Sequence, residues 1–226
     1  MKNFFILLIV FAGVLSFASC DNDSPASEQE FFNLKVGSQW SYKQYSYMVD
    51  TQDNYAYNGI SDVIEVVDNI SLNGIEFAKL KRIRTNENPG GSTSESFLYQ
   101  RINEEGHLVG YDPLFGTPLP DDLSQITETS GMMFHPGKDI SYENSNSAVF
   151  GTLFTHVIEG LQIVIEGNTY AVNSLVIDFT PPDATAPTRH SYSDYENKIG
   201  RVRSQYVPVS GSNVTEDRLV SFSLAE

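Results

Sequence analysis

The chain has 226 residues, a length that suits one domain or one large β-domain with additions. Its 29 acidic and 14 basic residues give a formal net charge of −15. Such an acidic surface repels nucleic acid, and the composition therefore excludes a nucleic-acid-binding protein. The chain has one cysteine, Cys20, so it contains no intramolecular disulfide.

The N-terminal segment has the layout of a secretory signal peptide. Lys2 supplies a positive charge, residues 4–12 are apolar, and the small residues Ala18 and Ser19 precede Cys20. The apolar run is shorter than the ~20 residues of a spanning helix, which argues against a permanent transmembrane segment. We expect residues 1–19 to be removed.

The residues around the cysteine suggest what happens after cleavage. Phe17-Ala18-Ser19-Cys20 resembles the lipobox of bacterial lipoproteins, with phenylalanine where leucine is usual. The resemblance implies that the thiol of Cys20 receives a diacylglycerol, so that a membrane is the partner through this residue. Two or more acyl chains anchor a protein stably. The alternative is an ordinary signal peptide that has a cysteine near its end by chance.

Residues 20–30 are predicted to form a disordered tether behind the lipid. The stretch after Cys20 is rich in acids, Ser and Pro and has no large apolar residue. Its acidic start resembles the export signal of surface lipoproteins of Bacteroidota. This resemblance implies an outer-membrane protein and favours display on the cell surface over a periplasm-facing position.

Residues 31–226 are predicted to form a single β-domain. Helical periodicity is scarce, whereas β-branched and aromatic runs recur between Gly, Asn, Asp and Pro. Asn73-Gly74 predicts a hairpin turn, and Asp121 to Ser124 could begin a short helical turn within the irregular, proline-containing segment 112–138. We expect strands at 39–49, 61–70, 75–84, 94–103, 107–111, 149–158, 162–166, 170–180, 188–196, 200–208 and 217–224.

In two of these strands, apolar and polar residues do not alternate regularly between the two faces. Trp40 and Tyr42 lie on one face of the first strand and Tyr45 on the other, which predicts a bulge or cover on both faces. In the third strand, Phe77 and Ile83 share a face that Lys79 and Lys81 interrupt.

The overall pattern predicts an all-β fold. We expect an antiparallel meander of roughly ten strands that curls into a half-barrel or barrel. A sandwich of two sheets is the alternative.

Two further motifs resemble those of bacterial envelope lipoproteins. Gly37-Ser38-Gln39-Trp40-Ser41-Tyr42 resembles their Gly-x-x-Trp-x-Tyr opening, and residues 195–203 resemble their closing hairpin; Asn33 replaces the usual proline. The resemblance implies a sheet curled around an apolar face, in the style of lipoprotein-carrier half-barrels, and no catalytic residue. We expect Trp40 and Tyr42 to be buried and Gly200 to allow a bend.

The remaining chain shows no catalytic or metal-binding motif. A Gly-x-Ser-x-Gly elbow is absent, and the four histidines, His107, His135, His156 and His190, have no metal-binding spacing. His190, Asp194 and Glu196 share a strand face that could hold a cation, but a solvated face is the simpler interpretation. We expect no catalytic residue, no metal and no cofactor.

Three functions remain open. The favoured one is a non-enzymatic binding or carrier module for a small apolar or amphipathic ligand. The alternative is a cell-surface structural or interaction protein that uses residues 112–138, and a hydrolase is less favoured.

Overall fold

A computed structural model describes residues 32–48, 55–137, 141–145, 151–183, 186–208 and 213–226. These residues form one antiparallel sheet of twelve strands. The strands are β1 Gln39–Met48, β2 Ala56–Leu72, β3 Ile75–Asn86, β4 Thr93–Ile102, β5 Leu108–Tyr111, β6 Met132–His135, β7 Ser141–Ser145, β8 Thr152–Ile165, β9 Asn168–Thr180, β10 Arg189–Glu196, β11 Gly200–Tyr206 and β12 Asn213–Ser223. Within the described ranges, no helix has the length and apolar character needed to cross a bilayer.

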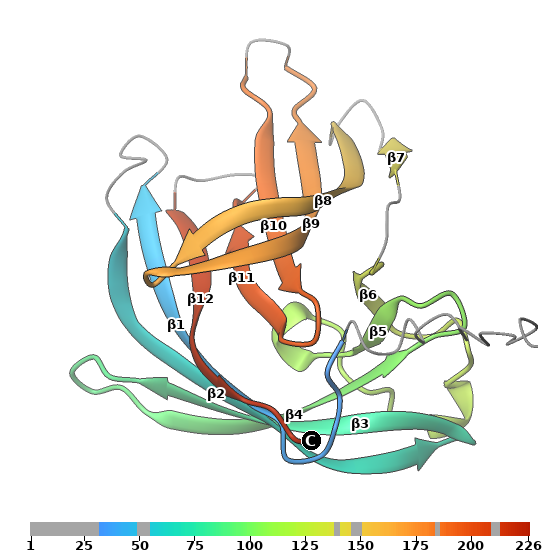
Figure 1. Ribbon diagram of the computed structural model, residues 1–226. Coiled ribbons are helices and arrows are strands. Elements are labelled where there is room, and N and C mark those ends of the chain that lie inside the picture. The colour runs from blue at the N-terminus through green and yellow to red at the C-terminus, as the bar shows by residue number, and fades with distance from the viewer. Residues whose placement is uncertain (1–31, 49–54, 138–140, 146–150, 184–185, 209–212) are drawn as a thin grey trace, which may run out of the picture.

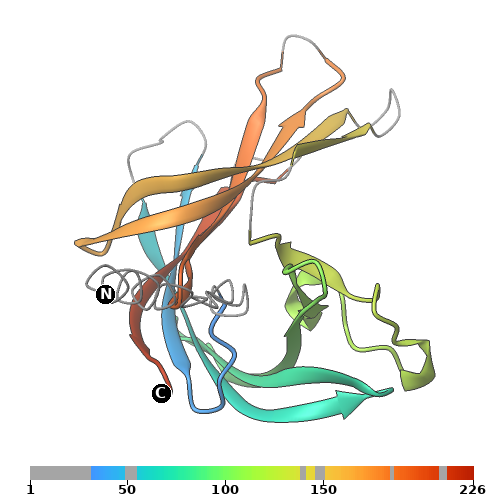
Figure 2. The same cartoon turned by 45° about the vertical axis from the view of Figure 1, so that its right-hand side comes forward.

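The sheet is a meander whose two halves meet in the middle. Its strand order is β6-β5-β4-β3-β2-β1-β12-β11-β10-β9-β8-β7, so the first and last strands are neighbours. Figure 1 shows that the sheet is strongly curled, and Figure 2 shows two arms, β2–β5 and β8–β10, that diverge from β1 and β12. The predicted all-β half-barrel is confirmed. The described strands form one open sheet, not a two-sheet sandwich.

Local turn chemistry explains the long hairpins. Asn73 (φ 50°) and Gly74 (φ 82°) adopt left-handed conformations in the predicted turn between β2 and β3. Glu166 (φ 47°) and Gly167 (φ 81°) do the same between β8 and β9. The predicted strands at 149–158 and 162–166 form the single strand β8, whose pairing shifts between Ile158 and Leu161.

Strand β1 is irregular in its pairing with both of its neighbours. Register shifts occur between Ser41 and Tyr42 against β12, and between Gln44 and Tyr45 against β2. Of the two predicted alternatives, the bulge is therefore present. The largest core cluster consists of Trp40, Tyr42, Ile64, Val66, Ala78, Leu80, Leu98, Ile165, Tyr170, Val172, Val202 and Leu219.

The tip of the β8–β9 hairpin belongs to this core. Figure 1 shows the hairpin crossing β12, and its residues Ile165 and Tyr170 pack in the cluster that contains Trp40. Glu166 at the turn lies 3.5 Å from the guanidinium of Arg218 on β12. The hairpin thus folds back over the middle of the sheet.

The two motifs near the ends of the chain meet in this core. The Nε1–H of Trp40 donates to the carbonyl of Ile199 at 2.6 Å, and the hydroxyl of Tyr42 donates to the carbonyl of Arg201 at 2.9 Å. Strand β12 separates β1 from β11, yet β11 pairs with β12 only from Arg203 onward. The two aromatic side chains therefore bind carbonyls in a segment, 199–201, that β12 does not pair with. This confirms the predicted core position of Trp40, which is 5 % exposed.

We expect Tyr42→Phe to lower the free energy of unfolding by about 1–3 kcal/mol, because it leaves the carbonyl of Arg201 without its donor. Trp40→Ala should cost about 3–5 kcal/mol, since it also empties core volume. Urea unfolding measures both changes. Tyr206→Phe, at a tyrosine that is 60 % exposed, is the matched control and should change stability by less than about 0.5 kcal/mol. Equal effects of Tyr42→Phe and Tyr206→Phe would contradict the hydrogen bond's contribution.

Candidate functional site

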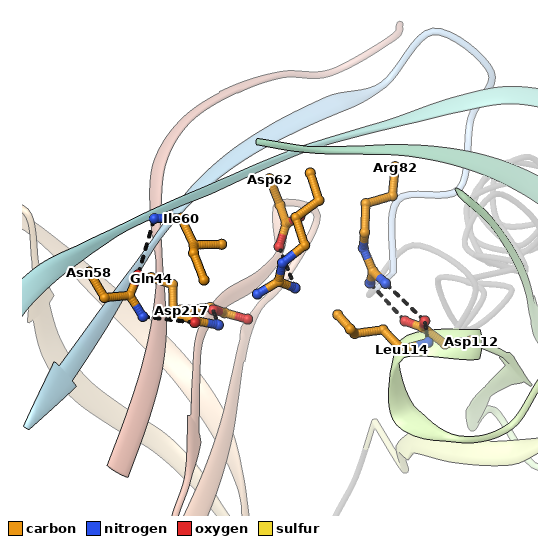
Figure 3. A network of polar contacts seen from close by, with 9 residues as sticks. Gln44, Asn58, Ile60, Asp62, Arg82, Asp112, Leu114 and Asp217 are labelled. Carbon is orange, nitrogen blue, oxygen red and sulfur yellow. Dashed lines mark hydrogen bonds and ion pairs between the residues drawn. The ribbon is translucent and has the colours of Figure 1, made fainter. Parts of the chain in front are cut away.

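The concave face of the half-barrel carries a row of buried polar side chains, which Figure 3 shows from close by. Arg82 on β3 donates two hydrogen bonds to the carboxylate of Asp112, at 2.8 and 2.7 Å. Both side chains are almost completely buried, at 3 % and 1 % exposure. A bidentate guanidinium–carboxylate pair is among the strongest and most directional polar contacts.

Asp112 also fixes the segment that follows it. Its Oδ1 accepts from the backbone N–H of Leu114 at 2.9 Å and so caps the short 3₁₀ turn Pro113–Phe115. Asp122 caps a second such turn, Leu123–Gln125, which confirms the turn expected there. Because Ile126 in this segment is 1 % exposed, the irregular middle of the chain is part of the packed fold.

Further polar residues continue along the concave face. Arg84 lies 3.3 Å from the carboxylate of Asp62, and burial raises the pKa of Asp62 despite the opposing effect of Arg84. Gln44 donates to Asp217 at 3.0 Å and accepts from Asn58 at 2.8 Å. These contacts place polar groups, mostly already paired, across a surface that is otherwise apolar.

Three adjoining hollows lie along this face. The one beside Trp40 and Leu80 has a volume of only about 60 Å³ and is therefore nearly filled by side chains. The second, of about 210 Å³, lies between β6 and β9–β11, and the third, of about 410 Å³, lies beside Gln44 and Asp217. Phe115 lines all three, and Tyr206 lines the two larger ones.

Edge strand β6 approaches β9 and β10 across the concave face. His135 at its end contacts the carbonyl of Asn173 through Nε2 at 3.1 Å, and its Nδ1 accepts from the N–H of Gly137 at 2.9 Å. Nε2 therefore carries the proton of the neutral ring. The ring also packs against Phe32 and Tyr195, at centroid distances of 5.8 and 4.7 Å. These side chains, without strand pairing, hold the two arms together.

Among the described residues, the remaining histidines form no metal site, and neither does the strand face of His190, Asp194 and Glu196 that was considered for a cation. His190 lies 2.6 Å from Asp178, and His156 lies 3.9 Å from the same carboxylate. Asp194 is fully buried and pairs with Arg203, so it does not join His190 and Glu196 at an exposed face. In the part of the chain that the structure describes, no three His, Cys, Asp or Glu side chains are placed to hold a metal ion.

Sequence analysis missed the polar residues of the concave face. Arg82 shares its strand face with the apolar residues Ala78 and Leu80. This alternation was the signal in the sequence that could have predicted a buried position for Arg82. Lys79 and Lys81 lie on the other face of this strand, and their charges indicated that this other face is the outer one. Cys20, the predicted lipid attachment residue, lies outside the described residues together with the predicted signal peptide and the whole predicted tether.

Comparison with known proteins gives little beyond the fold. No family model and no curated protein matches the chain. A predicted lipoprotein of Parabacteroides distasonis has a similar solved structure, with 13 % identity, a TM-score of 0.46, and coverage of 85 % of this chain and 98 % of its own. A predicted exported protein of Bacteroides fragilis, with a YmcC-like fold, covers the same shares at 12 % identity and a TM-score of 0.45.

One of these proteins is described as a lipoprotein and the other as an exported protein. Structural overlap at this level carries no conclusion about what this chain binds.

We expect acid to weaken the contact between the arms through His135. Burial lowers its pKa from 6.5 to about 4. The unfolded chain therefore takes up the proton first, and stability that is complete above pH 6.5 is lost as the pH falls toward 4. The loss should total about 3 kcal/mol. Urea unfolding of wild type and His135→Gln should show a stability difference that shrinks over this range.

His190→Gln removes an imidazole that is 48 % exposed and is the matched control. A difference between wild type and His135→Gln that stays constant from about pH 7 to about pH 4.5 would contradict the prediction.

We expect the effects of substitutions at Arg82 and Asp112 on the free energy of unfolding to be strongly non-additive. Asp112→Asn keeps the capping oxygen but leaves the guanidinium of Arg82 buried without a counter-charge, and it should cost about 3–5 kcal/mol. Adding Arg82→Met should recover much of this loss, because the orphaned charge is gone. Glu95→Gln, which breaks the exposed pair with Lys81, is the control and should cost less than about 1 kcal/mol. A double variant no more stable than Asp112→Asn would contradict this account.

Proposed function

We propose that this chain is a lipid-anchored protein of the outer membrane whose half-barrel binds a small apolar or amphipathic molecule on its concave face. The anchor is Cys20, and display on the cell surface is favoured by the acidic residues that follow it. The observation that supports binding is the unequal filling of the concave face. The end beside Trp40 is packed, whereas the hollows beside Phe115 and Tyr206 are open, at about 210 and 410 Å³.

The lining of these hollows suits such a ligand. Small-molecule sites are concave, mostly apolar, and carry a few placed polar groups. Met132, Phe134 and Leu175 give the second hollow an apolar wall, while Ser191, Ser204 and Tyr192 supply hydroxyl groups. Phe115 is 46 % exposed, and Tyr206 is 60 % exposed, so large side chains remain accessible there.

We expect the purified protein to enhance the fluorescence of a neutral naphthylamine dye that partitions into apolar sites. Ser204→Trp should remove most of this enhancement, because Ser204 lines both larger hollows and the indole would fill them. Ser221→Trp places the same ring at an exposed position of β12 and should leave dye uptake unchanged. No uptake by the wild type, or equal uptake by both variants, would contradict binding on the concave face.

We expect Cys20→Ser to abolish incorporation of an alkyne-labelled fatty acid in the native host, because the thiol is the acceptor of the lipid. Protease treatment of intact cells should degrade the wild-type protein if it is displayed on the surface. Labelling of Cys20→Ser at the wild-type level would contradict the lipid anchor, and full protection from protease would contradict surface display.

A further inference from the structure

The second hollow is lined by apolar and neutral polar side chains and by one positive charge. It lies where β6 crosses the inner face of β9, β10 and β11, and its apolar wall includes Met133, Phe134, Leu175 and Ile177. Among the described residues that line it, Arg201 is the one charged side chain. Arg201 also lines the narrow hollow beside Trp40, so this residue stands at the boundary between the packed core and the open space.

Arg201 differs from the other arginines of the concave face in its partners. Arg82 is paired with Asp112, and Arg84 lies against Asp62. The guanidinium of Arg201 lies over the ring of Tyr42, 4.7 Å from its centroid. No carboxylate of the described residues forms an ion pair with it.

The acids that act on Arg201 at longer range are engaged elsewhere. Asp112 and Asp217 both contribute to its electrostatic environment. Asp112 accepts two hydrogen bonds from Arg82, and Asp217 accepts one from Gln44. A guanidinium has five donors in a planar fork, and this fork matches a carboxylate. Arg201 therefore keeps donor capacity that the described protein groups do not use for an ion pair.

We propose that the concave face selects amphipathic anions, with a carboxylate bound by Arg201 and the apolar body lying against Met133, Leu175 and Ile177. This inference rests on the function proposed above and adds the charge of the ligand to it. A charge-assisted bidentate contact in a partly desolvated hollow orients the head group. The apolar wall then receives the chain that follows it.

The direct test compares three probes that share a decyl chain and differ in the head group: decanoate, decanol and decyltrimethylammonium. Each displaces the neutral naphthylamine dye from the wild-type protein in a titration. We expect decanoate to bind about tenfold more tightly than decanol, the ratio that a hydrogen bond to a charged group gives. The cation should bind most weakly. This order would arise against the net charge of −15, which repels anions from the protein as a whole.

Two variants assign the preference to one residue. Arg201→Gln should lower the affinity for decanoate to that for decanol and leave decanol binding unchanged. Lys81→Gln removes a positive charge from the outer face, where Lys81 pairs with Glu95 at 2.7 Å, and should keep the preference for decanoate. If Arg201→Gln does not fold, the order of the three probes on the wild type still decides the matter.

The outcomes separate the two proposals. Equal binding of decanoate and decanol to the wild type overturns the anion site while the binding function stands. Tighter binding of the cation overturns it as well, and so does a decanoate preference that survives Arg201→Gln. Failure of all three probes to displace the dye, or the absence of dye uptake, overturns the binding function and the anion site together.

Discussion

The structure depends on the contact that Trp40 and Tyr42 make across β12. Pairing between β11 and β12 covers only Arg203–Tyr206, so the first residues of β11, from Gly200 to Val202, are not paired with β12. The indole N–H and the phenol hydroxyl bind the carbonyls of Ile199 and Arg201 at that point. Gly200 between them has φ 98°, a conformation that glycine adopts at little cost, and a Cβ there would lie 3.7 Å from the indole nitrogen of Trp40. The same contact therefore closes the core and sets the position of Arg201 at the edge of the hollow.

Polar groups on the concave face position the walls of the hollows. A buried ion pair contributes little net stability, because desolvation offsets much of the Coulomb attraction. The pair of Arg82 and Asp112 instead holds the turn Pro113–Phe115 in place, and Phe115 from this turn reaches all three hollows. His135 acts where the two arms approach each other, and its contact with Asn173 holds β6 against β9. The shape of the open space thus follows from two polar contacts between segments far apart in the chain.

Local patterns predicted most of the fold. The turn at Asn73-Gly74, the long strands and the buried Trp40 follow from residue types and alternation alone. Strands β6 and β7 were not predicted, because neither Met132–His135 nor Ser141–Ser145 is long enough to show a period. The concave-face residues were also missed. Arg82 and Asp112 are 30 positions apart, and which charges become neighbours depends on how tightly the sheet curls. That no described carboxylate forms an ion pair with Arg201 is likewise a property of the folded surface, since the sequence around it shows only an arginine after a glycine.

Native mass spectrometry of the protein purified gently from its own host tests the central claim most directly, because it asks what the concave face holds. We predict a population whose excess mass corresponds to one small amphipathic molecule, identified after release as an anion. The same preparation of Ser204→Trp, whose added ring fills the larger hollows, should lack this population. Protein that is reproducibly empty, or an identical adduct on wild type and Ser204→Trp, would contradict a binding function for the concave face.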